Sequence, residues 1–95
     1  MPPVHPGEIL REDLMKPLGL TITGLAREPK LPASRVSEVV NGRRAINADA
    51  ALRLARYFGN TPEFWINLRA AYDLRLTIHS SASRIEREVR PRRAA

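Results

Sequence analysis

Prolines and glycines divide this chain into short stretches, and those stretches carry apolar residues three or four positions apart. Residues at this spacing share one face of an α-helix, and proline or glycine punctuates the ends of helices. The breaks fall near residues 6, 17–19, 29–32, 42, 59 and 62. The sequence therefore predicts an all-α fold made mostly of short helices.

Spacing also predicts which side of each helix is buried. The first helix starts at His5–Glu8 and ends at Pro17 and Gly19, with Ile9, Leu10, Leu14 and Leu18 as its stripe. The helix over residues 50–58 is expected to bury Ala51, Leu52, Ala55 and Phe58 and to turn Arg53 to water. Thr21 and Thr61 are expected N-caps, and Gly42 the left-handed residue that ends a helix.

The last helix is expected to start at Pro62 and to end near residue 79. Two alternatives stay open beyond Tyr72: alternation of Leu74, Leu76 and Ile78 permits a short strand, and the Ser83–Glu86 pair could cap a separate short helix. Residues 1–90 are expected to form one domain, and residues 91–95 a disordered basic tail.

Two short helices, at about 21–29 and 32–41, with a tight turn between them predict a helix-turn-helix. In that motif the second helix enters the major groove of DNA. Its inner face must be apolar, which Val36, Val39 and Val40 provide. Its outer face must offer hydrogen-bonding groups, and the candidate base-contacting residues are Ala33, Ser34, Arg35, Ser37 and Glu38.

Chemistry suggests a role for each of these groups. Arg35 can donate two hydrogen bonds to guanine or neutralise a phosphate, and Glu38 can accept from the cytosine amino group. Candidate phosphate contacts are Arg27, Asn41, Arg43 and Arg44. The alternative is an ordinary helical hairpin in a small bundle.

The basic excess of the chain suits a polyanionic partner. The net charge is +6. Residues 32–60 carry five arginines against two acidic residues, while residues 1–31 balance to zero. Such an excess attracts nucleic acid or an anionic membrane surface, although a protein can also be basic without binding either.

The composition gives little support for catalysis. No cysteine is present, and His5 and His79 stand far apart without acidic neighbours at metal-ligand spacing. We expect no enzyme activity, no metal, no cofactor and no small-molecule substrate. No apolar run is long enough for a membrane span and no secretory signal is recognisable, so we expect a cytoplasmic protein with no membrane partner.

The last helix has two apolar sides. Phe64, Trp65, Leu68 and Tyr72 form one side, which we expect to pack in the core rather than to line a ligand pocket. The other side is Ile66, Ala70, Leu74 and Ile78, and it is the candidate interface of a homodimer. The alternative is that this helix is simply central in its own fold.

Several phrases of the sequence resemble a known family. Residues 19–44, with GLT at 19–21, LA at 25–26 and VSEVVNGRR at 36–44, resemble the Cro and phage-repressor (XRE) class of helix-turn-helix. The phrases HPGEIL at 5–10, ALRLARYFG at 51–59 and TPEFWINL at 61–68 resemble the HigA (VapI-like) antitoxins. The match extends from about residue 5 to about residue 76.

The resemblance implies a five-helix phage-repressor-like domain with an extended C-terminal helix. It also implies a homodimer formed through the C-terminal region, binding to an operator in the protein's own promoter, and neutralisation of a HigB-like, RelE-class toxin that cleaves mRNA. It adds Thr21 to the phosphate contacts. Lys30 stands where the family usually has glycine, and a positive φ there is strained, so the turn is expected to be reshaped.

Two other functions remain open. One is a stand-alone XRE-type repressor with no toxin, and the other is a protein-interaction module whose helix-turn-helix no longer binds DNA.

Overall fold

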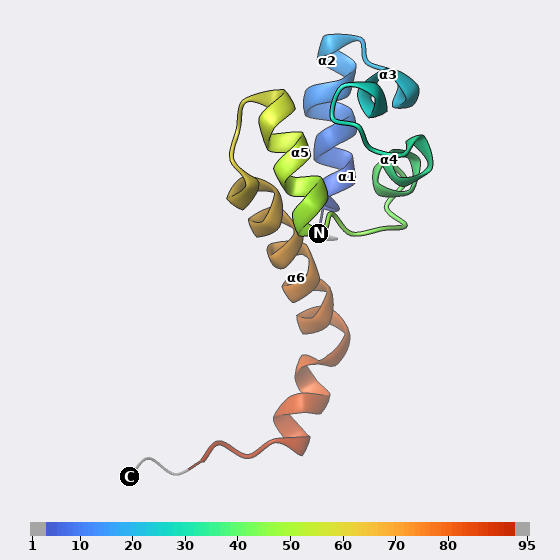
Figure 1. Ribbon diagram of the computed structural model, residues 1–95. Helices are drawn as coiled ribbons and strands as arrows, with labels where there is room; N and C mark the ends of the chain where they lie inside the picture. The colour runs from blue at the N-terminus through green and yellow to red at the C-terminus, as the bar shows by residue number, and fades with distance from the viewer. Residues whose placement is uncertain (1–3, 93–95) are drawn as a thin grey trace.

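The computed structural model describes residues 4–92, and every regular element within that range is helical (Figure 1). Three consecutive elements form one continuous helix: α1 (Pro6–Ile9), the π-helical η1 (Leu10–Met15) and α2 (Lys16–Leu18). There follow α3 (Ile22–Arg27), α4 (Ala33–Val40), α5 (Ala48–Phe58) and α6 (Pro62–Glu88). The expected all-α fold of five helices with an extended last helix is confirmed.

The π-helical segment changes which residues of the first helix are buried. A π-helix closes its hydrogen bonds between residues i and i+5, so residues five apart lie on one face. Leu10 and Met15 have this separation, and both are buried. Leu18, by contrast, is 62% exposed. The stripe expected from α-helical spacing is therefore wrong at Leu18, and it missed Met15.

Side chains cap the starts of α3, α5 and α6, which satisfies amide hydrogens that have no partner inside the helix. Thr21 Oγ1 accepts from the Gly24 amide at 3.0 Å, Asn47 Oδ1 from Ala50 at 2.8 Å, and Thr61 Oγ1 from Phe64 at 3.2 Å. The expected caps at Thr21 and Thr61 are confirmed. Pro32 precedes α4 as its N-cap, with an extended ψ of 136°, and does not begin the helix as its first residue.

The core lies where the shorter helices meet the first turns of α6. Its largest fully buried side chains include Leu10, Leu25, Ile46 and Trp65. Trp65 donates its indole N–H to Asn60 Oδ1 at 2.9 Å, so this buried polar group has a partner. The packing role expected for Trp65 is confirmed, whereas Phe64 beside it is 40% exposed.

The buried face of α5 differs from the expected one: Leu52 is absent from it, and it includes Ala50 and Leu54, which were not expected. Ala51, Leu54 and Ala55 are buried, and Phe58 packs against the core. These residues are three or four apart and share one face. Leu52 lies off that face and is 60% exposed, so its expected burial is wrong.

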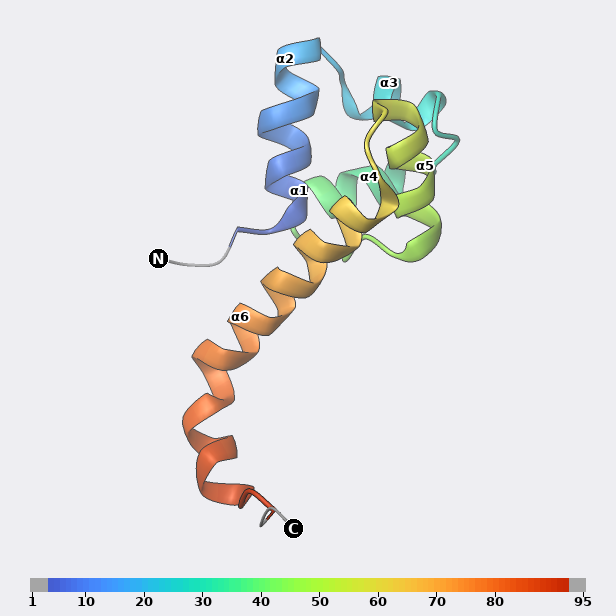
Figure 2. The ribbon, with the colours of Figure 1, turned by 90° about the vertical axis from the view of Figure 1, so that its left-hand side faces the viewer.

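The last helix, α6, is one unbroken rod of 27 residues, about 40 Å long at 1.5 Å per residue. Its first turns pack on the other helices, and its far half extends away from them (Figures 1 and 2). The helix extends beyond the expected end at residue 79. Both alternatives for this region, a strand at 74–78 and a separate short helix capped by the Ser83–Glu86 pair, are therefore wrong. Of the tail expected at 91–95, residues 93–95 lie outside the described residues.

Among the described helices, none combines the length and the apolar character that crossing a membrane requires.

Candidate nucleic-acid interface

Helices α3 and α4 are joined by residues 28–32 in a tight turn (Figure 1). Lys30 adopts a φ of +57°, a left-handed conformation that costs a non-glycine residue about 1 kcal/mol or more. The Leu31 amide then donates to the Ala26 carbonyl at 3.0 Å, and the Leu31 side chain is buried. Lys30 therefore takes up the conformation of a glycine itself, and the expected reshaping of the turn is wrong at this residue.

The inner face of α4 is apolar, as expected. Val36, Val39 and Val40 are all buried in the core. On the outer side, Ala33 and Ser34 are exposed, whereas Ser37 and Glu38 are half-buried. The helix thus presents the two small residues at its start to solvent.

The end of α4 is fixed by Gly42, which has a φ of +74°. The Gly42 amide donates to the Val39 carbonyl at 3.0 Å and the Arg43 amide to the Glu38 carbonyl at 2.8 Å. These paired bonds are those of a Schellman motif, and the left-handed residue expected at Gly42 is confirmed. Arg43 and Arg44 follow at once, and both are exposed.

Arg35 lies between the outer face of α4 and the core. It is half-buried, and its side chain lines a small internal cavity together with Leu10, Leu54 and other core residues. Its Nε is buried and has no hydrogen-bond partner among residues 4–92. Because part of its side chain is buried against the core, Arg35 faces outward less fully than its place in the sequence suggested.

Two contacts organise the polar residues near the end of α4. Arg44 Nη1 lies 3.5 Å from Glu38 Oε2, and Asn41 Nδ2 donates to the Ser37 carbonyl at 2.9 Å. The side chains of Glu38 and Arg44 are each about half accessible to solvent, so their ion pair adds little stability, but it places a positive charge beside the one acidic group of this helix. At the start of α3, Thr21 is exposed; its oxygen accepts from Gly24, which leaves its hydroxyl hydrogen available. Arg27 is exposed as well.

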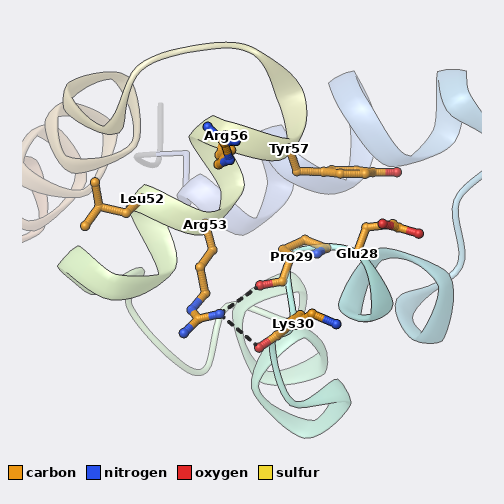
Figure 3. Close-up of a pocket in the computed structure, with 7 residues that line it drawn as sticks. All are labelled: Glu28, Pro29, Lys30, Leu52, Arg53, Arg56 and Tyr57. Carbon is orange, nitrogen blue, oxygen red and sulfur yellow. Dashed lines mark hydrogen bonds between the residues drawn. The ribbon is translucent and has the colours of Figure 1, made fainter.

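Sequence reasoning missed two supports of this surface. Arg53 of α5, expected to face water, donates to carbonyls of the α3–α4 turn (Figure 3). Gly7 of α1 lies so close to the Val39 carbonyl that a Cβ on Gly7 would collide with it. Gly7 lies in the segment HPGE and Arg53 in the segment LRL. The spacing of residues in these segments does not indicate a contact with α4 or with the turn before it.

His5 lies where α1, α4 and α6 come together. Its Nδ1 accepts from the Gly7 amide at 2.9 Å and so caps α1, and its ring meets Tyr72 of α6 edge-to-face at 4.8 Å. Burial lowers the pKa of His5 below its ordinary value of 6.5, and the nearby charge of Asp73 partly offsets this. Protonation of Nδ1 would remove the acceptor of the cap.

These features together describe a helix-turn-helix protein of the DNA-binding class. The helix-turn-helix family model matches residues 12–66. Virulence-associated protein I of Dichelobacter nodosus is 50% identical over 76 residues, which cover 80% of this chain and 70% of that protein.

Solved structures narrow the assignment. An addiction module antidote protein of the HigA family from Coxiella burnetii is 48% identical, with a TM-score of 0.91 over 97% of this chain and 100% of that one. The Pseudomonas aeruginosa antitoxin HigA, solved with the higBA promoter, is 39% identical, with a TM-score of 0.90 over 94% of this chain and 97% of that one. The chain belongs to the HigA and VapI-like antitoxins of the helix-turn-helix family.

The lowered pKa of His5 predicts a pH dependence of folding. Because the folded pKa lies below the unfolded one, the unfolded chain binds more protons as the pH falls below about 6.5. The free energy of unfolding should therefore be highest at neutral pH and should fall as the pH drops below about 6.5. His5→Asn keeps a capping acceptor and should flatten the curve measured by urea unfolding.

His79→Asn, at an exposed position on α6, is the matched control and should leave the pH profile as in the wild type. A His5→Asn profile as steep as the wild type would show that other groups cause the dependence.

Proposed function

We propose that this chain is the antitoxin of a HigB/HigA-type pair, which represses its own promoter and neutralises a HigB-like, RelE-class ribonuclease that cleaves mRNA. One observation carries the DNA-binding part: the inner valines of α4 anchor a helix whose first two residues, Ala33 and Ser34, are exposed and whose end leads into Arg43 and Arg44. The promoter complex of the Pseudomonas aeruginosa relative supports the same assignment. A protein that works on operator DNA would act in the cytoplasm.

The roles of individual residues are proposed from their positions. The base-contacting set comprises Ala33, Ser34, Arg35, Ser37 and Glu38, and the phosphate set comprises Thr21, Arg27, Asn41, Arg43 and Arg44. The exposed first turn of α4 favours Ala33 and Ser34 for direct base contacts. Glu38 would approach the groove with its charge offset by Arg44. In the sequence the phosphate set lies on both sides of α4, with Thr21 and Arg27 at the two ends of α3 and the other three residues after α4; contacts of this kind with the DNA backbone would fix the register.

We propose further that the far half of α6 forms a homodimer. Within α6, all of whose residues are described, Trp65 is the one fully buried residue, and Ile66 and Leu68 beside it are partly buried. Of the stripe Ile66, Ala70, Leu74 and Ile78, the first packs on the chain's own core and the other three are exposed. Ile85 further along the helix and Val89 directly after its end are exposed as well. A long run of exposed apolar side chains favours a second copy as the cover.

Operator binding is tested by two arginine variants in fluorescence anisotropy on the chain's own upstream DNA. Arg35→Met keeps an apolar stem for the core but loses the donors, so it should cost about 1–3 kcal/mol of binding and relax preference at one base position. Arg43→Met should weaken binding to every duplex and lower the salt slope by about one.

Arg75→Met, an exposed charge on α6, is the control for net charge and should change neither quantity much. A wild-type protein that does not distinguish its upstream DNA from an unrelated duplex would favour the protein-interaction module instead.

The dimer is tested by Leu74→Asp, at a position 62% exposed on α6. A charge placed inside an apolar interface is costly, so this variant should be monomeric at concentrations where the wild type sediments as a dimer in analytical ultracentrifugation. Leu18→Asp on α2, at a position that is also 62% exposed, should remain dimeric. A monomeric wild type, or a dimeric Leu74→Asp, would contradict the proposed interface.

The toxin partner is tested by co-expression with the product of the adjacent gene. A HigB-like partner should co-purify with this chain, and its cleavage of mRNA should be inhibited in the complex. Selective operator binding without any co-purifying neighbour would support the second candidate, a stand-alone XRE-type repressor, which the DNA-binding surface alone supports equally well.

A further inference from the structure

The turn between α3 and α4 is held from outside by a side chain of α5. Arg53 Nη1 donates to the Pro29 carbonyl at 3.2 Å and to the Lys30 carbonyl at 3.4 Å, as Figure 3 shows. These two residues lie more than twenty positions before Arg53 in the chain. The contact therefore ties two separate elements together at the point where the chain turns toward α4.

Arg53 is itself fixed in place. Its Nε donates to Asp49 Oδ1 at 2.8 Å, one turn earlier on the same helix. One guanidinium group thus uses its planar fork to serve a carboxylate on α5 and two carbonyls of the turn, a geometry that lysine cannot reproduce. The fork lies in an open groove of about 450 Å³, lined also by Glu28, Leu52, Arg56 and Tyr57.

The two carbonyls belong to the strained part of the turn. Lys30 holds its φ of +57° without the freedom of glycine, and such a conformation persists only where surrounding contacts impose it. Lys30 is followed by the buried Leu31, then by Pro32 and the first residue of α4. A change of φ at Lys30 would therefore swing the exposed first turn of α4, where Ala33 and Ser34 lie.

We propose that Arg53 is a positioning residue for DNA recognition: it holds the Pro29–Lys30 turn in its left-handed conformation and so sets the angle at which α4 meets the duplex. This role rests on the proposed operator binding. It differs from a phosphate contact, because Arg53 acts through the turn and not through its charge.

The test compares Arg53→Met, Lys30→Gly and the double variant, with Arg56→Met as control. Arg56 lines the same groove but makes no hydrogen bond to the other residues drawn in Figure 3. Dissociation constants are measured on the upstream operator and on an unrelated duplex at several salt concentrations. Thermal unfolding of each variant checks that its fold is intact.

Arg53→Met should raise the operator Kd about tenfold relative to Arg56→Met, the effect expected for losing charged hydrogen bonds. Its Kd on the unrelated duplex and its salt slope should equal those of Arg56→Met. Glycine adopts a positive φ without strain, so in Lys30→Gly the turn no longer needs the hydrogen bonds of Arg53. The double variant should therefore recover most of the lost operator affinity. Arg53→Lys, which keeps the charge but lacks the fork, should lose affinity as Arg53→Met does.

Several results would overturn this role. Equal loss on both duplexes with a shallower salt slope, or full affinity in Arg53→Lys, would make Arg53 a phosphate contact. If the operator Kd of Arg53→Met matches that of Arg56→Met, or if the double variant recovers no affinity, Arg53 does not position the turn. Operator binding itself would still stand. A wild type that binds both duplexes equally would instead overturn the proposed function, and this role with it.

Discussion

The packing of three valines of α4 into the core is the contact on which the rest of the molecule depends. Val36, Val39 and Val40 are buried, and burial of each such side chain is worth about 1.5–3 kcal/mol. Because the inner side of α4 is fixed in this way, Ala33 and Ser34 must face outward. Three further contacts act on α4. Gly42 ends the helix, and Gly7 allows α1 to approach the Val39 carbonyl. Arg53 holds the turn that precedes α4.

Local rules predicted those parts of the fold that depend on local interactions. The capping threonines and Gly42 act within a few residues of themselves, so their sequence context was sufficient. Met15 and Leu18 were misassigned because a π-helical turn shifts the buried face, and the chain shows no marker for that turn. The predicted burial of Leu52 is wrong because apolar character alone does not distinguish Leu52 from Leu54, two positions further on, which is the buried one.

The candidate DNA surface also has features that local spacing predicts and features that depend on contacts between separate elements. The inner and outer faces of α4 follow from helical spacing, and they could be predicted. The buried Nε of Arg35, the Glu38–Arg44 pair and the contact of Arg53 with the turn depend on how separate elements come together. Side chains of arginine reach far in several directions, so their partners cannot be found from sequence spacing. The length of α6 was underestimated because polar residues replace much of its apolar pattern after Ile78.

The unbroken course of α6 has a geometric consequence. A helix advances about 100° around its axis with each residue, so the number of residues between Trp65 and Leu74 fixes the rotational phase between the anchored end and the protruding end. Substitutions along this rod keep that phase, whereas insertion or loss of a single residue would rotate the whole distal apolar face away from its present direction. Evolution can therefore vary the composition of this segment far more freely than its length.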